Sequence, residues 1–263
     1  MLELCVLASG SRGNCIYVGG KKTKLIIDAG LSAKQIKLRL EEIKVDADML
    51  DALCISHDHT DHIQGARVMH RKHKLALYSN GGTLEGIYRA DERNRELPWK
   101  VFSTGHPFQV GEFTIEPFSV PHDALEPVGF IIKSDHGTVG VATDLGVVTN
   151  LIREKLRHCE ALVLETNHCP KMLQNADRPW FLKQRIAGRQ GHLSNPAAGE
   201  LAIELAKAGN LKHLFLAHLS SDCNDPKVAM HSIKSALKKA DCDHINVEMT
   251  HQNQISNLWR TEN

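Results

Sequence analysis

The sequence predicts an α/β fold made of two halves that each combine a β-sheet with helices. Short apolar runs bounded by glycine and other turn residues alternate with stretches of helical periodicity. The strand and helix pattern of the early chain returns after residue 144. No internal repeat, low-complexity segment or linker divides the chain, so residues 1–263 are expected to form one domain.

The early chain predicts four strands and two helices. The expected strands are residues 2–7, 16–18, 25–27 and 50–55. Ser32 is the expected N-cap of a helix in which Ile36, Leu40 and Ile43 recur at helical spacing. A second helix is expected over residues 63–73.

The middle of the chain predicts mostly antiparallel strands, and the remainder returns to alternating strands and helices. The expected strands are residues 101–102, 113–120, 128–132, 139–142, 161–165 and 213–217. The expected helices lie near residues 148–157, 195–208 and 226–239. Residues 166–194 lack clean periodicity, and a stretch of that length in a compact domain is usually functional.

The composition excludes several classes of protein. Lys+Arg number 32 and Asp+Glu number 31, and this near balance argues against an indiscriminate polycation. No apolar run is long enough for a membrane helix, and the first residues lack the order of a signal peptide. A cytoplasmic protein without a membrane partner is therefore expected. Seven scattered cysteines without a Cys-x-x-Cys pair are expected to be reduced thiols.

Sixteen histidines direct attention to metal ligands. The densest group follows the strand 50–55 and contains His57, His59, Asp61 and His62. On a loop, His57 and His59 can face one cation while Asp61 and His62 face a second one nearby. Few structural roles require such an arrangement.

Three further residues of ligand type follow later predicted strands, namely His122, Asp144 and His218. Each of them alone would more often be a capped or surface polar residue. Open α/β sheets bind ligands at the carboxyl ends of their strands, and several such ends here carry His or Asp. Taken together, these residues favour a metal site.

The His-x-His-x-Asp-His run, together with the three later residues, resembles the motif pattern of the metallo-β-lactamase-fold hydrolases. This resemblance implies a four-layer αββα sandwich of two mixed β-sheets flanked by helices. It implies a first metal held by His57, His59 and His122, a second held by Asp61, His62 and His218, and Asp144 as a bridge. Asp28 matches a family position that is generally structural. Asp28 or Asp58 is expected to accept a hydrogen bond from a metal-binding histidine.

The flanking sequence is similar to the YycJ/WalJ-type branch of these hydrolases, whose members are identified as exonucleases. The similar segments are Ser9–Asn14, Gly191–Asn195 and Ala217–Ser220, and the similarity runs from Leu7 to about Pro226. Ser56 and Asp58 depart from the more usual Thr and Glu, at positions that are not ligands. The resemblance implies two divalent cations, with zinc and manganese as the expected metals.

A phosphodiesterase must also hold phosphate and protonate the leaving oxygen. Residues 178–199 carry four Lys or Arg residues and no Asp or Glu, so Arg185 and Arg189 are expected phosphate contacts, although an ordinary basic helix face fits equally. His192 is the candidate proton donor, and His168 is a second candidate for donating a proton or gripping phosphate.

Other polar and aromatic residues of this segment are candidate substrate contacts. Ser194 and Asn195 begin an expected helix, whose free N–H groups can meet a phosphate. Trp180 and Phe181 form a candidate base-stacking pair.

The predicted function is hydrolysis of a phosphodiester in DNA or RNA by an exonuclease, with nucleic acid as the partner. A hydroxide bridging two cations would attack in line, and Asp61 would bind metal and orient that hydroxide. One alternative is a thioesterase or lactonase of the same fold, which would not need the basic segment. Another is a non-catalytic scaffold that keeps the metal for stability.

Overall fold

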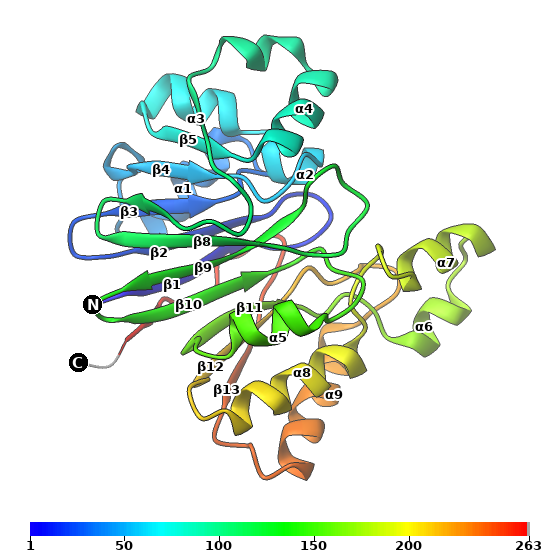
Figure 1. The fold of residues 1–263 in the computed structure, drawn as a ribbon. Coiled ribbons are helices and arrows are strands. Elements are labelled where there is room, and N and C mark those ends of the chain that lie inside the picture. The colour runs from blue at the N-terminus through cyan, green and yellow to red at the C-terminus, as the bar shows by residue number, and fades with distance from the viewer. Residues whose placement is uncertain (262–263) are drawn as a thin grey trace.

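The computed structural model describes residues 1–261, in which two seven-stranded mixed sheets pack face to face (Figure 1). In spatial order, the first sheet contains β14 (Trp259–Arg260), β1 (Glu3–Ala8), β2 (Cys15–Gly19), β3 (Lys24–Ile27), β4 (Ala52–Cys54), β5 (Ala76–Ser79) and β6 (Trp99–Val101). The second contains β13 (Asn246–Met249), β12 (His213–Ala217), β11 (Ala161–Glu165), β10 (Gly137–Ala142), β9 (Val128–Ser134), β8 (Phe113–Ser119) and β7 (Phe108–Val110).

The helices cover the outer faces of these sheets, apart from α6 and α7, which project at one edge (Figure 1). In the first half they are α1 (Ala33–Glu42), α2 (Thr60–Ile63), α3 (Ala66–His73) and α4 (Gly81–Ala90). In the second half they are α5 (Asn150–Leu156), α6 (Pro170–Asn175), α7 (Trp180–Ala187), α8 (Asn195–Lys207) and α9 (Pro226–Lys239). Short 3₁₀ turns occupy Ala47–Met49 and Glu92–Glu96.

The two sheets share one plan. In the first, β1, β2 and β3 are antiparallel neighbours, and β3 to β6 run parallel. In the second, β8, β9 and β10 are antiparallel neighbours, and β10 to β13 run parallel. Parallel neighbours need crossover connections, most often helical, which explains why strands and helices alternate in both halves. The recurrence seen in the sequence corresponds to these two half-sandwiches.

Three apolar layers hold the sandwich together and confirm the four-layer prediction. Between the sheets, Phe113, Phe130 and Phe215 are fully buried. A second layer packs the first sheet against α1, α3 and α4, as shown by buried Ile36. A third layer packs the second sheet against α5, α8 and α9, where Leu201 is buried.

The structure confirms most of the predicted elements and corrects several. The helix predicted over 63–73 is divided into α2 and α3, because the N–H of Gly65 donates to the Ala29 carbonyl at 2.7 Å instead of continuing one helix. Strands β5, β7, β13 and β14 and helix α4 were not predicted, and the strand predicted over 101–102 is found as β6 at Trp99–Val101. Residues 166–194, which lack clean periodicity, contain α6 and α7.

The expectations about cysteines and membranes were also tested within residues 1–261. The seven cysteines are free thiols, and six of them are buried. No helix in this part of the chain is both long and apolar enough to cross a bilayer. A cytoplasmic location stays a prediction.

Gly30 joins the first sheet to the loops at its carboxyl edge. Its N–H donates to the Asn14 carbonyl at 2.8 Å, and the N–H of Asn14 donates to the Asp61 carbonyl at 2.8 Å. A Cβ atom on Gly30 would lie 1.6 Å from the Asp61 carbonyl oxygen, so this contact is available only to glycine. The start of α2 is thereby pinned against the end of β3.

We predict that Gly30→Ala lowers the free energy of unfolding by at least about 1–3 kcal/mol. The added methyl group would force the backbone of Asp61 away from that of residue 30. Gly81→Ala is the matched control, since a Cβ on Gly81 at the start of α4 meets nothing within 4 Å. That control should be neutral or slightly stabilising. Urea unfolding measures both, and equal stability of the two variants would contradict the prediction.

Candidate metal centre

The candidate ligands lie on loops at the carboxyl ends of strands from both sheets. His57 and His59 follow β4, and Asp61 and His62 belong to α2. The three later residues, His122, Asp144 and His218, follow β8, β10 and β12. Because the two sheets face each other, these ends converge at one edge of the sandwich.

Three residues at these strand ends have left-handed backbone conformations. The φ angles are +62° at Asp28, +55° at Asp144 and +54° at His218. Non-glycine residues adopt this region at a cost, and such strain gathers at functional sites. Local hydrogen bonds hold it, as when the N–H of His218 donates to Ser9 Oγ at 2.6 Å.

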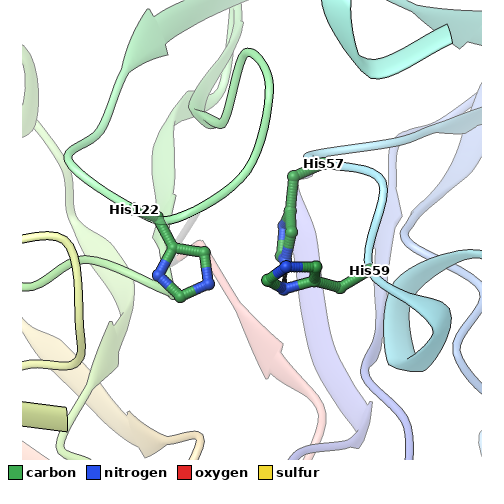
Figure 2. A group of neighbouring side chains, drawn as sticks. All are labelled: His57, His59 and His122. Atoms are coloured by element: carbon green, nitrogen blue, oxygen red, sulfur yellow. Dashed lines mark hydrogen bonds between the residues drawn. The ribbon is translucent and has the colours of Figure 1, made fainter. Parts of the chain in front are cut away.

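The first group of donors contains His57, His59 and His122, whose rings surround a common space (Figure 2). His57 Nε2 lies 3.1 Å from His59 Nδ1. His122 approaches from the other side, with ring centroids 5.2 Å from His57 and 5.1 Å from His59. The N–H at Nδ1 of His122 donates to the Gly191 carbonyl at 3.0 Å, so Nε2 is the nitrogen left to bind a cation.

The second group contains Asp61, His62 and His218. Asp61 Oδ2 lies 3.5 Å from His62 Nε2 and 3.7 Å from His218 Nε2. Asp144 lies between the two groups, since its Oδ2 is 3.3 Å from His62 Nε2 and its Oδ1 is 3.8 Å from His122 Nε2. The structure thus brings all seven predicted ligands into two adjoining clusters.

The donor atoms fit a divalent metal. Three buried atoms in this region have no hydrogen-bond partner within the described residues: His122 Nε2, Asp144 Oδ2 and His218 Nε2. A buried polar atom without a partner is costly, and an ion is one explanation for it. Imidazole and carboxylate donors suit zinc, manganese and iron.

The electrostatics of the cluster favour the ligand protonation state of His57 and of the two carboxylates. Burial lowers the pKa of His57 well below its ordinary value, with help from nearby His62, so this imidazole is neutral. Burial alone would raise the pKa of Asp144, but His218 and His62 hold it well below its ordinary value. Burial would likewise raise the pKa of Asp61, yet the nearby imidazoles of His218 and His62 lower it. Both carboxylates therefore stay ionised.

Burial alone would lower the pKa of His62 and of His218. Nearby carboxylates, Asp28 and Asp144 at His62 and Asp144 at His218, instead raise the pKa of these two histidines above the ordinary value. Both rings must therefore lose a proton to bind a metal.

A cleft of about 290 Å³ opens over the donor atoms. His192 and Arg185 line it, as do Asp61, His122 and Asp144. Leu182, Arg185 and Ile186 place one face of α7 along its wall. The geometry is that of a recessed, polar site with a histidine and a guanidinium beside the donors.

Comparison with known proteins assigns the family. Residues 23–219 match a family model described as a beta-lactamase superfamily domain. The solved structure of the metallo-beta-lactamase fold protein YhfI from Bacillus subtilis superposes with a TM-score of 0.73 at 17% identity, covering 98% of this chain and 100% of that one. This chain belongs to the beta-lactamase superfamily and has the metallo-β-lactamase fold.

Curated relatives within the superfamily are similar over nearly their whole length. The chain is 34% identical over 238 residues to exodeoxyribonuclease YycJ of Bacillus anthracis, covering 90% of each protein. It is 35% identical over 242 residues to exodeoxyribonuclease WalJ of Streptococcus pneumoniae strain D39, covering 90% of this chain and 88% of that one. The resemblance read from the motifs is confirmed.

Asp28 supports the second group of candidate donors through His62. The N–H at Nδ1 of His62 donates to Asp28 Oδ2 at 2.7 Å, and the Ser56 N–H and hydroxyl donate to the same carboxylate at 2.8 and 2.7 Å. His62 is thereby oriented with Nε2 toward the donors. Asp58 was a wrong choice for such a role, because its carboxylate accepts from the Leu125 N–H at 3.3 Å and packs against Gly86.

Glu165, at the end of β11, is a site residue that the sequence analysis missed. It is fully buried, and its Oε1 accepts from Nδ1 of both His192 and His218, at 2.7 and 2.9 Å. Its Oε2 accepts from the backbone N–H groups of Leu145 and Leu193, at 2.8 and 3.1 Å. Four donors saturate this carboxylate, so it positions both histidines instead of binding a cation. The available signal was an acidic residue at the end of an otherwise apolar strand, as at Asp28.

Asp123 is a second missed residue. It lines the cleft and forms an ion pair with Arg185, whose Nε lies 2.6 Å from Asp123 Oδ2. Arg178 is paired in the same way with Asp222. The local charge of the basic segment is therefore smaller than its sequence indicates.

Four predicted substrate contacts do not lie in the cleft. Arg189 borders an adjoining groove, and Asn195 is buried in a reciprocal side-chain amide pair with Asn224 at 2.9 Å. Ser194 caps α8 by accepting from the Ala197 N–H. His168 lines a separate cavity, where burial lowers its pKa to about 4. Burial or local hydrogen bonds, which sequence spacing does not reveal, withdraw His168, Ser194 and Asn195, whereas Arg189 is exposed beside the adjoining groove.

The turn Ser9–Asn14 packs against the second group of donors. Asn14 Nδ2 donates to Asp61 Oδ2 at 3.1 Å, and Ser9 accepts from the backbone of His218. Ser11 reaches the wall of the cleft. This turn therefore links β1 to Asp61 from the first half of the sandwich and to His218 from the second.

We predict that Asp28→Asn weakens divalent-metal affinity by about 10- to 100-fold, because the acceptor that orients His62 loses its charge. Asp58→Asn is the control and should leave affinity nearly unchanged, since within residues 1–261 the Asp58 carboxylate accepts from the Leu125 N–H and from no candidate ligand side chain. Competition with a chromophoric chelator measures both affinities. Equal losses in the two variants would contradict the assigned role of Asp28.

We predict that Glu165→Gln lowers the free energy of unfolding by about 1–3 kcal/mol, because its amide N–H₂ would face groups that are themselves donors. Glu154→Gln on the exposed face of α5 should change stability by less than about 0.5 kcal/mol. Denaturant unfolding in the presence of chelator separates this effect from metal binding. A Glu165 variant as stable as the control would show that the four hydrogen bonds are dispensable.

Proposed function

We propose that this protein is a metal-dependent exonuclease that hydrolyses phosphodiester bonds in DNA or RNA. The observation that carries the proposal is the pair of adjoining donor clusters beneath a cleft that also holds a carboxylate-bound histidine, His192, and the guanidinium of Arg185. The similarity to two exodeoxyribonucleases over 90% of the chain supports the same substrate class.

In this proposal, residues 1–263 work as one domain and hold two divalent cations, zinc or manganese. The first would be held by His57, His59 and His122, and the second by Asp61, His62 and His218, with Asp144 shared between them. Two bound cations would supply a hydroxide nucleophile near neutral pH and would neutralise charge on the phosphoryl oxygens.

The chain's own side chains divide the remaining work. Asp61 projects into the cleft and accepts a hydrogen bond from Asn14, which fixes its orientation toward an attacking water. His192 keeps its Nδ1–H on Glu165, so Nε2 is the nitrogen available to hold a proton for the departing oxygen. Glu165 acts through His192 and His218, so we class it as a positioning residue.

Arg185 is the proposed phosphate contact. Its side chain is well exposed and lines the cleft, and its ion pair with Asp123 holds the guanidinium beside His122. Arg pairs with phosphate through directed N–H donors, whereas carbonyl hydrolysis needs no cation at this position. This feature favours the nuclease over a thioesterase or lactonase.

We predict that metal-loaded protein shortens end-labelled oligonucleotides stepwise, and that Asp61→Ala lowers the rate at least about 100-fold by removing a cation ligand and a water contact. Arg185→Ala should lower the rate on oligonucleotides by about 10-fold or more. Gel analysis of single- and double-stranded DNA and RNA, with zinc or manganese added, measures these rates. Lys234→Ala on α9 is the control for a lost surface charge.

Two outcomes would overturn the proposal. Turnover of a thioester without cleavage of any oligonucleotide would identify a carbonyl hydrolase. If Asp61→Ala lowered thermal stability but the intact protein had no activity on either substrate, the metal cluster would be a structural element of a scaffold.

A further inference from the structure

A second cavity lies on the other side of α7 from the cleft. It has a volume of about 440 Å³ and is bordered by residues of α6, α7 and the start of α8. This volume falls within the range of small-molecule pockets. In Figure 1, α6 and α7 project from the sandwich, so the cavity lies in the segment that departs from the regular alternation of strands and helices.

His192 connects this cavity to the candidate metal centre, because its side chain lines both spaces. A ligand with one group at the metal cluster and another in the second cavity would therefore pass beside His192. A nucleotide has that form, since its base and its phosphate are joined through the sugar.

The walls of the cavity match a nucleobase. Trp180 stands at its border with its side chain 68% exposed, and Leu173, Ala187 and Ala197 add apolar surface. An exposed indole is suited to stack on a base, and stacking tolerates any base because each has a π-face. The amides of Gln174 and Gln184 also line the cavity, and they offer both donors and acceptors to a base edge.

His168 is the second, independent sign of a ligand. It is only 4% exposed, lines the cavity, and has a buried Nδ1 with no hydrogen-bond partner among the described residues. Because burial lowers its pKa to about 4, the ring is neutral near pH 7 and carries one donor and one acceptor. Such a ring matches a base edge better than it matches a phosphate.

The same walls argue against other ligands. No Asp or Glu lines the cavity among residues 1–261, which removes the usual oxygen ligands of a cation. Lys183 lines it, but its Nζ donates to the Gln174 carbonyl at 2.7 Å, and the start of α8 is already capped by Ser194. A phosphate would find little that is free to bind it.

We propose that this cavity is a nucleobase subsite that accepts the base of a nucleotide adjoining the phosphodiester at the metal cluster. The inference rests on the proposed nuclease function and narrows its substrate to a strand whose base at this position is unpaired, since a paired base has its edge covered. Trp180 stacks on that base, and His168 contacts its edge.

The test compares oligonucleotides with and without a base at each of the last few positions of the attacked end, using a tetrahydrofuran abasic residue as the replacement. For the wild-type protein, the abasic residue at one position should lower kcat/KM on the order of 5- to 100-fold. In Trp180→Ala, the oligonucleotides with and without the base should have nearly equal kcat/KM. In His168→Ala, the difference in kcat/KM should be smaller than in the wild-type protein but still present.

The structure separates the predicted stacking pair, because Trp180 lines the cavity and Phe181 does not. Phe181→Ala is therefore the matched control, since Phe181 is the next residue of α7 and is 66% exposed. The Phe181→Ala variant should keep the wild-type ratio of kcat/KM between the oligonucleotides with and without the base. Wild-type protein that cleaves both oligonucleotides equally at every position would overturn the subsite while leaving the nuclease intact. Wild-type protein that cleaves no oligonucleotide would instead overturn the proposed function, and equal effects of the Trp180 and Phe181 variants would show a general role of α7.

Discussion

Buried carboxylates that hold imidazoles in place are the interaction on which the site depends. Asp28 fixes His62, and Glu165 fixes His192 and His218, in each case through Nδ1. Burying these charges is costly unless each is paired and hydrogen-bonded, and both carboxylates accept at least three hydrogen bonds. The result is that each ring presents its other nitrogen in a direction set before any cation or substrate arrives.

The sandwich makes this arrangement possible by repeating one plan twice. Asp28 directly follows β3 in the first sheet, and Glu165 ends β11 in the second, so each half contributes one buried acid that holds histidines. The left-handed residues Asp28, Asp144 and His218 turn the chain sharply where their strands end. Rigid strands thus carry the fixed partners, while α6 and α7 extend beyond the sheets and form the walls next to them.

The sequence predicted much of this organisation, because apolar runs that end in His or Asp are visible without a structure. The seven candidate ligands and the α/β class came from that pattern, and the four layers came from the family resemblance. What the sequence could not predict depends on burial and pairing. In the sequence, Glu165 is simply the last residue of a predicted strand, and Asn195 stands at the start of a predicted helix. Only the structure shows that Glu165 holds two histidines and that Asn195 is buried in a pair with Asn224.

Strand β14 has a consequence for how the protein is made. The Leu2 N–H donates to Thr261 Oγ1 across 259 positions of sequence, β14 pairs with β1, and the Ser9 N–H donates to the His251 carbonyl. The turn that steadies Asp61 and His218 therefore gains its outer support from residues that leave the ribosome well after every candidate ligand has been synthesised. During translation, the turn Ser9–Asn14 lacks these contacts until residues 251–261 have been synthesised. The site is therefore completed late in the synthesis of the chain.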